Sequence, residues 1–172
     1  MTDNEFLAIV NENDEIISKA KRDKIHNSGK LHRETSILIV NQNNEILIQK
    51  RSDNNKLDYS ASGHVLYNED YKEAAEREIK EELGLTITKF NKIGKFKIKS
   101  NDQSKINNRF ICLFEVKDDY KITDLKINKK EVKSIDYYSK SKLKEIIKNN
   151  PDLMCAGFID LLNKYLEEQD DN

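Results

Sequence analysis

The sequence predicts an α/β fold in which helices pack against a mixed β-sheet. Short apolar or alternating runs, typical of strands, occur before and after a single internal amphipathic helix, and two helical segments follow the last strand. The 172 residues contain one proline, and no low-complexity linker divides them, so we expect one domain over residues 1–172. This order of elements predicts an α/β sandwich around a mixed sheet.

The first part of the chain is predicted to be mostly strand. Residues 5–10 and 15–22 form two strands around a polar turn, within an N-terminal strand extension expected over residues 1–30. Residues 35–41 and 45–51 are apolar or alternating runs separated by a short polar turn. That pattern is typical of a β-hairpin.

The second half is predicted to hold three more strands. After the internal helix over residues 71–83, the alternating segments 92–99 and 109–116 are predicted strands, with the polar segment 100–108 as the loop between them. Residues 131–138 form the last strand.

Two helices are expected over residues 139–168. Ser139 or Ser141 caps the first, and Pro151 or Asp152 begins the second. The second helix carries an apolar stripe that could pack on the domain or on a second subunit, so a homodimer is one expected partner arrangement. The stripe consists of Leu153, Phe158, Leu161, Leu162 and Tyr165.

The internal helix carries two acidic residues where apolar ones are expected. At 100° per residue, Glu78 and Glu82 lie roughly 40° apart on the arc that should face the core. Two carboxylates four residues apart repel each other, and burying them without compensation is costlier still. A divalent metal ion is the simplest positive partner. The apolar arc is made by Tyr71, Ala74, Ala75, Ile79 and Leu83.

The segment 63–85 resembles the Nudix box, G-x5-E-x7-R-E-U-x-E-E-x-G-U, where U is a bulky aliphatic residue. The resemblance to this family covers roughly residues 31–148, and it implies an α/β/α sandwich. A purely solvated surface helix would explain the outer Lys and Glu residues, but not the acids on the apolar arc or the framing glycines. The matching positions are Gly63, Glu69, Arg77, Glu78, Ile79, Glu81, Glu82, Gly84 and Leu85.

The resemblance implies a loop–helix–loop that holds Mg²⁺ or Mn²⁺. Glu78 and Glu82 would be direct metal ligands, since Mg²⁺ takes a few carboxylate oxygens and keeps waters for the rest. Glu81 would bind a second ion through water or orient the attacking water. Gly63 would let the backbone approach the metal closely, and Gly84 would end the helix.

The implied reaction is hydrolysis of a diphosphate linked to another group, X. A nucleoside diphosphate derivative is the default substrate, and an isoprenoid diphosphate is the second option. Glu81 is the first choice for the base, and Glu131 is the second because some family members take the base from outside the box. Arg51 and Lys50, at the end of the second hairpin strand, could contact phosphate.

Arg77 is expected to act through a neighbouring carboxylate. It would pair with Glu69 or Glu81 and hold that side chain in position.

Residues ahead of the box are similar to the isopentenyl-diphosphate isomerase-like branch of the family. His26, His32 and His64 fall near positions where isomerases place histidine ligands for a second metal. An isomerase would carry a cysteine just before the box glycine, but residues 60–62 of this chain are Ser-Ala-Ser. It would also carry a pair of glutamates on the later strand, but residues 107–110 are Asn-Asn-Arg-Phe. Hydrolysis is therefore favoured over isomerisation, and over a non-catalytic binding module, which usually loses box acids.

Composition limits the partners. The formal net charge is −1 with 35% charged residues, which gives no basic excess for binding a nucleic-acid polymer. Cys112 and Cys155 lie among apolar neighbours, so we expect buried reduced thiols. No apolar stretch reaches membrane-spanning length and the N-terminus has no signal-peptide pattern. The chain is expected to be cytoplasmic, without a membrane partner.

Overall fold

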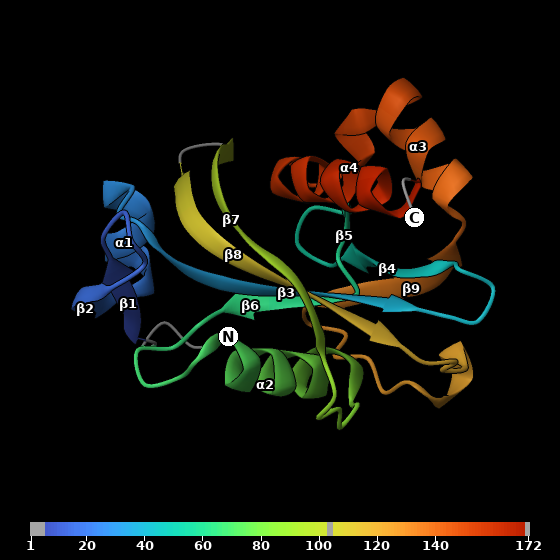
Figure 1. Ribbon diagram of the computed structural model, residues 1–172, viewed down its shortest axis with the longest axis horizontal. Helices are drawn as coiled ribbons and strands as arrows, with labels where there is room; N and C mark the ends of the chain where they lie inside the picture. The colour runs from blue at the N-terminus through green and yellow to red at the C-terminus, as the bar shows by residue number, and fades with distance from the viewer. Residues whose placement is uncertain (1–5, 103–104, 171–172) are drawn as a thin grey trace.

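The computed structural model describes residues 6–102 and 105–170. These residues form a nine-stranded mixed sheet, with α2 (Tyr71–Leu83) on one face and α3 (Lys140–Asn149) and α4 (Ala156–Asp170) on the other (Figure 1). The predicted α/β/α sandwich is confirmed. Within the described residues, no helix is both long and apolar enough to cross a membrane.

The N-terminal region contains a helix that the sequence did not predict. Strands β1 (Phe6–Val10) and β2 (Ile16–Lys21) form the expected antiparallel pair, and α1 (Arg22–Ser28) follows directly. The predicted strand therefore ends one residue too late. Ile25 is the only large apolar residue of α1, so the segment has no helical periodicity to detect, and the helix ends at Gly29 with φ 62°.

The centre of the sheet is β3 (His32–Val40). It pairs antiparallel with β4 (Ile46–Arg51), which confirms the hairpin, and antiparallel with β6 (Ala61–His64). On its other side β3 runs parallel to β8 (Lys105–Lys117). The short strand β5 (Leu57–Asp58) pairs antiparallel with β4.

The predicted loop 100–108 is wrong. Strand β7 (Asn91–Asp102) pairs antiparallel with β8 along its length, with one register shift between Lys92 and Gly94, and Lys99 lies opposite Asn108. The Asn, Ser and Lys residues there resemble a loop in composition, but backbone pairing along an extended hairpin needs no apolar side chains. The connection is therefore much shorter than predicted.

Helix α2 (Tyr71–Leu83) has the bounds that the sequence predicts. The Asp70 side chain accepts hydrogen bonds from the Lys72 and Glu73 backbone amides, and the Asp70 amide donates to the Glu73 carboxylate, which completes a capping box. The helix ends at Gly84, whose φ of 72° is the left-handed conformation expected there.

The C-terminal part departs from prediction in one place. After η1 (Ile122–Asp124), β9 (Val132–Tyr138) pairs with β4, and α3 (Lys140–Asn149) begins with Ser139 as its cap. The segment from Pro151 forms only a short 3₁₀ turn, η2 (Pro151–Leu153), since the Cys155 amide donates to the Leu57 carbonyl and interrupts the helix.

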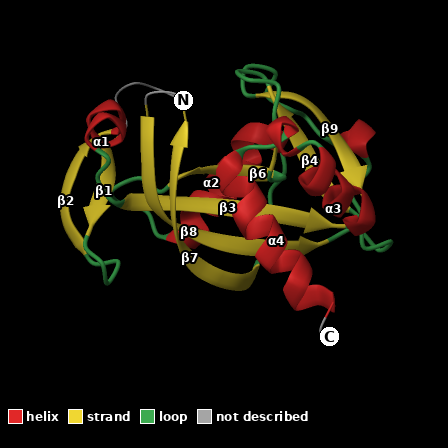
Figure 2. Ribbon diagram, turned by 90° about the horizontal axis from the view of Figure 1, so that it is seen from above, coloured by secondary structure: helices red, strands yellow, loops and turns green. Residues whose placement is uncertain are grey.

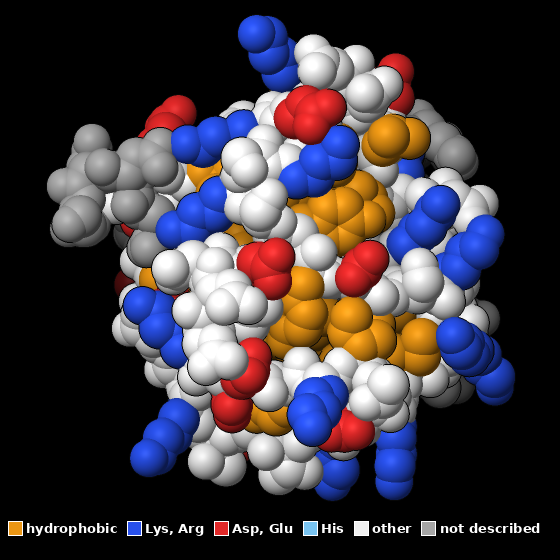
Figure 3. Space-filling model, turned by 90° about the vertical axis from the view of Figure 1, so that its right-hand side faces the viewer, with side chains coloured by type: hydrophobic (Ala, Val, Ile, Leu, Met, Phe, Trp, Pro, Cys, Tyr) orange, Lys and Arg blue, Asp and Glu red, His pale blue; other side chains and the backbone are white. Residues whose placement is uncertain are grey.

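The last helix, α4 (Ala156–Asp170), begins after that interruption. Figure 2 shows it crossing the central strands. Four of the five predicted stripe residues are buried against the sheet, whereas Leu153 is 53% exposed. The stripe thus packs mainly within the chain, and a homodimer stays a prediction. Figure 3, which views the side of α3, shows acidic and basic side chains interspersed among hydrophobic ones.

Alternating residues of β3 supply two cores. Leu38 and Val40 pack toward α4, and Ile37 and Ile39 pack toward α2. Because alternate residues of a strand share a face, Glu34 lies on the same α4 side of the sheet as Leu38. Of the two cysteines, both free, Cys112 is buried as expected and Cys155 is only partly buried.

Candidate active site

The two inward acids of α2 are buried. Glu78 is 4% exposed and Glu82 is 2% exposed. Burial raises the pKa of the Glu78 carboxyl to about 7, even though Arg77 opposes the shift. Burial, with the neighbouring charge of Glu78, raises the pKa of Glu82 well above its usual range. Burial and mutual repulsion thus disfavour the charged forms of both carboxylates, and a bound cation would stabilise them.

Gly63 makes room for one of these carboxylates. A Cβ added at Gly63 would overlap Oε1 and Cδ of Glu78 and stand 2.6 Å from its Oε2. Among the described residues, that Oε2 is buried and has no hydrogen-bond partner. Glu82 Oε2 accepts hydrogen bonds from Gln49 Nε2 at 3.0 Å and from the Ser62 amide at 3.3 Å.

The implied metal fits this arrangement. Two buried carboxylates lie close to each other, one of them has an oxygen without a partner, and hard oxygen donors are what Mg²⁺ and Mn²⁺ take. Glu78 and Glu82 are the residues that would hold the ion, against the backbone of Gly63.

Arg77 fixes the carboxylates around it. Its Nε donates to Glu69 Oε1 at 2.7 Å and its Nη2 donates to Glu69 Oε2 at 2.9 Å. Nη1 donates to Glu78 Oε1 at 2.7 Å, while Glu81 Oε1 is 3.8 Å away. Nη2 also donates to the His64 carbonyl at 2.9 Å. Arg77 therefore joins the loop before α2 to Glu78 itself, a contact that the sequence did not single out.

The two candidate bases lie on different elements. The Glu81 side chain is 47% exposed at the edge of α2. Glu131 lies in the turn just before β9, half-buried, where Asn128 Nδ2 donates to its Oε1 at 3.2 Å. The charge of Glu131 contributes to the raised pKa of both Glu78 and Glu82, so this acid belongs to the same electrostatic group.

The two predicted phosphate ligands are separated by the fold. Arg51 lines a cavity and donates to Asp53 and to Asp58 Oδ2, the latter at 3.2 Å. Lys50 lines a different hollow, beside Ile48 and Tyr138, since neighbouring residues of a strand point to opposite faces. The structure therefore does not bring Lys50 to the site.

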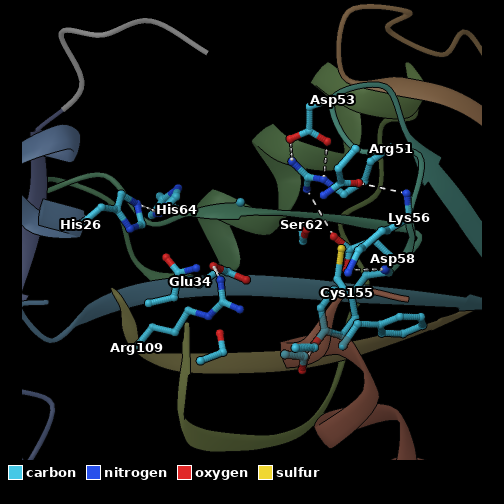
Figure 4. A pocket seen from close by; sticks show the side chains of 18 of the residues that line it. His26, Glu34, Arg51, Asp53, Lys56, Asp58, Ser62, His64, Arg109 and Cys155 are labelled. Carbon is cyan, nitrogen blue, oxygen red and sulfur yellow. Dashed lines mark hydrogen bonds and ion pairs between the residues drawn. The ribbon is translucent and has the colours of Figure 1, made fainter. Parts of the chain in front are cut away.

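The cavity has a volume of about 260 Å³ and adjoins the acid pair through Ser62 and Gly63. Its walls are unusually rich in charge, as Figure 4 shows. Sequence reasoning missed several of these residues; among those, Glu34 carried a signal, as an acid directly before the apolar run of residues 35–41. The charged side chains in the wall are Arg22, Glu34, Arg51, Asp53, Lys56, Asp58 and Arg109.

The three histidines meet at one end of this cavity. Their side-chain nitrogens can all lie within 4.8 Å of one another, and the Nε2 atoms of His26 and His64 are 3.0 Å apart. Nδ1 of His32 lies 2.9 Å from the Lys30 carbonyl, which assigns the proton to Nδ1 and leaves Nε2 as an acceptor. Burial lowers the pKa of His32 to about 4 and that of His64 well below its usual range, so both are neutral.

Neutral imidazoles can ligate a transition metal, but this group lacks a negatively charged ligand. Within the described residues, the cluster contains histidines only. Arg22 and Arg109 lie close enough to lower the pKa of His32 and His64 further, which also weakens the attraction for a cation. Metal or phosphate contact by the three histidines therefore stays a prediction.

Helix α2 thus presents two buried acids to a glycine at the edge of a polar cavity, within an α/β/α sandwich. The family model of the NUDIX domain matches residues 30–155. The chain belongs to this family, and it is an enzyme of the Nudix pyrophosphohydrolase class. The family acts generally on nucleoside diphosphate derivatives.

The chain is similar to individual proteins of this family in sequence and in fold. An uncharacterised Nudix hydrolase of Listeria innocua is 32% identical over 164 residues, which cover 90% of each chain. An isopentenyl-diphosphate Delta-isomerase of Aliivibrio fischeri is 26% identical and covers 94% of this chain and 95% of its own. A crystal structure of a Deinococcus radiodurans protein, 22% identical, superimposes with a TM-score of 0.77 over 93% of this chain and 98% of that one.

Proposed function

We propose that the protein hydrolyses the diphosphate linkage of a nucleoside diphosphate-X, or of a related organic diphosphate, with Mg²⁺ or Mn²⁺ as cofactor. The observation that carries the proposal is the buried Glu78 carboxylate. It is pressed against Gly63, held by Arg77 and repelled by Glu82, and one of its oxygens has no partner among the described residues. An acid in that state is organised for a cation rather than for the stability of the fold.

The residues have separate roles in this reaction. Arg77 orients Glu78, and through Glu69 it ties the loop before the helix to the site. The bound ion would neutralise phosphate oxygens and lower the pKa of a coordinated water. Glu81, which is exposed and close by, is the first candidate to accept the proton of that water, and Glu131 is the second.

The isomerase reading has one observation in its favour, the convergence of the three histidines. Two others oppose it. Ser62, directly before Gly63 where the cysteine is expected, lines the cavity with a hydroxyl in place of a thiol. On β8, Arg109 stands opposite His32, where carbon protonation would need an acid.

The test is release of phosphate-containing products from a panel of diphosphates, with Mg²⁺, Mn²⁺ or a chelator. The panel contains nucleoside diphosphate sugars, dinucleoside polyphosphates, nucleoside triphosphates and isoprenyl diphosphates. We expect cleavage of at least one class, abolished by the chelator and by Glu82→Gln. Glu76→Gln, which changes an acid on the outer part of the same helix, is the matched control and should retain activity.

Two results would overturn the proposal. If no member of the panel is cleaved while metal still binds, the binding-module or isomerase reading replaces it, and a double-bond shift assay separates those two. If Glu82→Gln retains both metal affinity and turnover, the assignment of the acid pair is wrong.

The choice of base has its own experiment. Glu81→Gln and Glu131→Gln should be compared for metal affinity by calorimetry and for turnover against pH. We expect the variant lacking the base to bind metal as the parent does while its turnover falls about 10²- to 10⁴-fold and loses its acidic limb. Loss in both variants would mean that the acids share the role.

A further inference from the structure

An ion pair on the α4 side of the sheet forms part of the cavity wall. Glu34 comes from β3 and Arg109 from β8, and Arg109 Nη1 donates to Glu34 Oε2 at 2.6 Å. The two side chains are 7% and 15% exposed, respectively. In Figure 4 the pair lies below His26 and His64, and the group of Arg51, Asp53 and Asp58 lies to the right.

The Arg109 guanidinium has hydrogen-bonding capacity left over. Of its five N–H groups, the ion pair with Glu34 uses one, and within the described part of the chain the buried Nε has no partner. Nη2 lies against the start of α4, where a Cβ added at Gly157 would overlap it. A glycine at that point therefore admits the guanidinium to the cavity.

The ion pair and the residues next to the acid pair line different parts of the same cavity. Strands β8, β3 and β6 are neighbours in the sheet, and Gly63, which seats Glu78, is on β6. Arg109 pairs with His32 and Gly63 pairs with Thr35, so Arg109 lies two strands across and three residues along from Gly63, roughly 14 Å away. Glu34 pairs with His64, one strand across, and points to the α4 side of the sheet. A substrate whose diphosphate lies at the acid pair would therefore present its other group, X, to Glu34 and Arg109.

We propose that Glu34 and Arg109 recognise X, and that they restrict it to a polar group carrying both hydrogen-bond donors and acceptors, such as a sugar or a nucleoside. This inference rests on the proposed function, because it assigns the second half of the same substrate. The guanidinium supplies donors and the carboxylate supplies acceptors to one side of the cavity.

The same pair excludes an isoprenoid chain. A hydrocarbon lying over it would displace water from both charges and offer no hydrogen bond in return, which is strongly unfavourable. Sites built to hydrogen-bond a substrate group reject analogues that lack it by large factors, up to about 10⁴- to 10⁵-fold. The pair therefore decides between the two substrate classes that the sequence leaves open.

The experiment replaces both partners, since removing one alone would leave a buried charge unpaired. The variant is Glu34→Met/Arg109→Met. Arg33→Met is the matched control, because Arg33 lies on the same strand and pairs with buried Asp14 at 2.7 Å with similar exposure, 16% and 5%, outside the cavity wall. Asp14 keeps Lys95 and Tyr71 as partners in that control.

Affinities are measured by calorimetry with Mg²⁺ on a Glu81→Gln/Glu131→Gln background, which keeps the acid pair and suppresses turnover. The probes are uridine diphosphate glucose, geranyl diphosphate and inorganic pyrophosphate, which has no X. We expect the parent to prefer the sugar nucleotide to geranyl diphosphate by at least about 10²-fold. The double Met variant should lose most of that preference, with pyrophosphate affinity and the Arg33→Met control unchanged.

Three results would overturn the inference. The first is that the double variant prefers the sugar nucleotide to geranyl diphosphate as strongly as the parent does. The second is that the double variant loses affinity for pyrophosphate as much as for the sugar nucleotide, which would place the pair at the phosphates. The third is that the parent itself prefers geranyl diphosphate. Failure of the proposed function looks different. In that case the Glu81→Gln/Glu131→Gln protein, with Glu34 and Arg109 unchanged, would bind the sugar nucleotide selectively. The parent protein, which keeps Glu81 and Glu131, would cleave no member of the panel. Recognition of X would then stand without hydrolysis.

Discussion

Replacing Gly63 with alanine should inactivate the enzyme while leaving its fold in place. The added Cβ would overlap the end of the Glu78 side chain, so the carboxylate must move by about an ångström or more. Its present position is fixed by Arg77 Nη1 at 2.7 Å, and the movement stretches or breaks that hydrogen bond. The three atoms nearest to the added Cβ all belong to the flexible Glu78 side chain, not to the backbone.

The Gly63→Ala substitution should therefore reduce catalysis much more than it reduces the free energy of unfolding. An off-rotamer Glu78 costs about 1 kcal/mol, a small part of the stability of a typical domain. A displacement of about 1 Å in a group that positions the reaction costs about 10²-fold in turnover. Alanine at this position should thus lower kcat far more than it lowers the midpoint of thermal unfolding.

The assay pairs thermal unfolding with steady-state kinetics and Mg²⁺ titration on the best substrate of the panel. Gly94→Ala is the control, since its Cβ would meet the tip of the Phe96 ring at 2.7 Å on β7, outside the cavity wall. Near-parental kcat and Mg²⁺ affinity in Gly63→Ala would refute the idea that this glycine seats a catalytic carboxylate. Equal kinetic losses in both variants would refute it as well.

Two further predictions concern stability. Asp70→Ala removes the acceptor of two backbone amides at the start of α2 and should destabilise the protein by about 1 kcal/mol, seen as a lower denaturation midpoint in urea; no change would contradict the capping role. Tyr165→Phe removes the hydroxyl that donates to Glu115 Oε2 at 2.5 Å, and leaving this buried acid without that donor should cost about 1–3 kcal/mol. Tyr138→Phe, a partly buried tyrosine whose hydroxyl makes no hydrogen bond within the described residues, is the control, and an equal loss there would refute the specific role of Glu115.

The features that the sequence predicted correctly are those with a local cause. Helix α2 has its predicted bounds because its cap at Asp70, its 3.6-residue period and its terminal Gly84 are all encoded within 15 residues. The inward direction of Glu78 and Glu82 follows from that same period, and it was enough to predict a metal site before any fold was known.

The wrong predictions arose where composition and backbone pairing disagree. The polar segment 100–108 resembles a loop, but pairing of β7 with β8 makes it strand. The helix α1 has too few apolar residues for a periodic signal, and it is stabilised by packing of Ile25 against β1. In both places tertiary contacts outweighed local preference.

By itself, then, the sequence determined the box helix, its acids and its capping glycine, because these depend on residues a few positions apart. Only the tertiary structure decided what surrounds them. The parallel register of β3 and β8 sets Arg109 opposite His32 and beside Glu34, and it draws together residues about 75 positions apart. No local pattern encodes such a register, because it depends on how whole strands bury their apolar faces, and it is that register which shapes the part of the cavity that meets X.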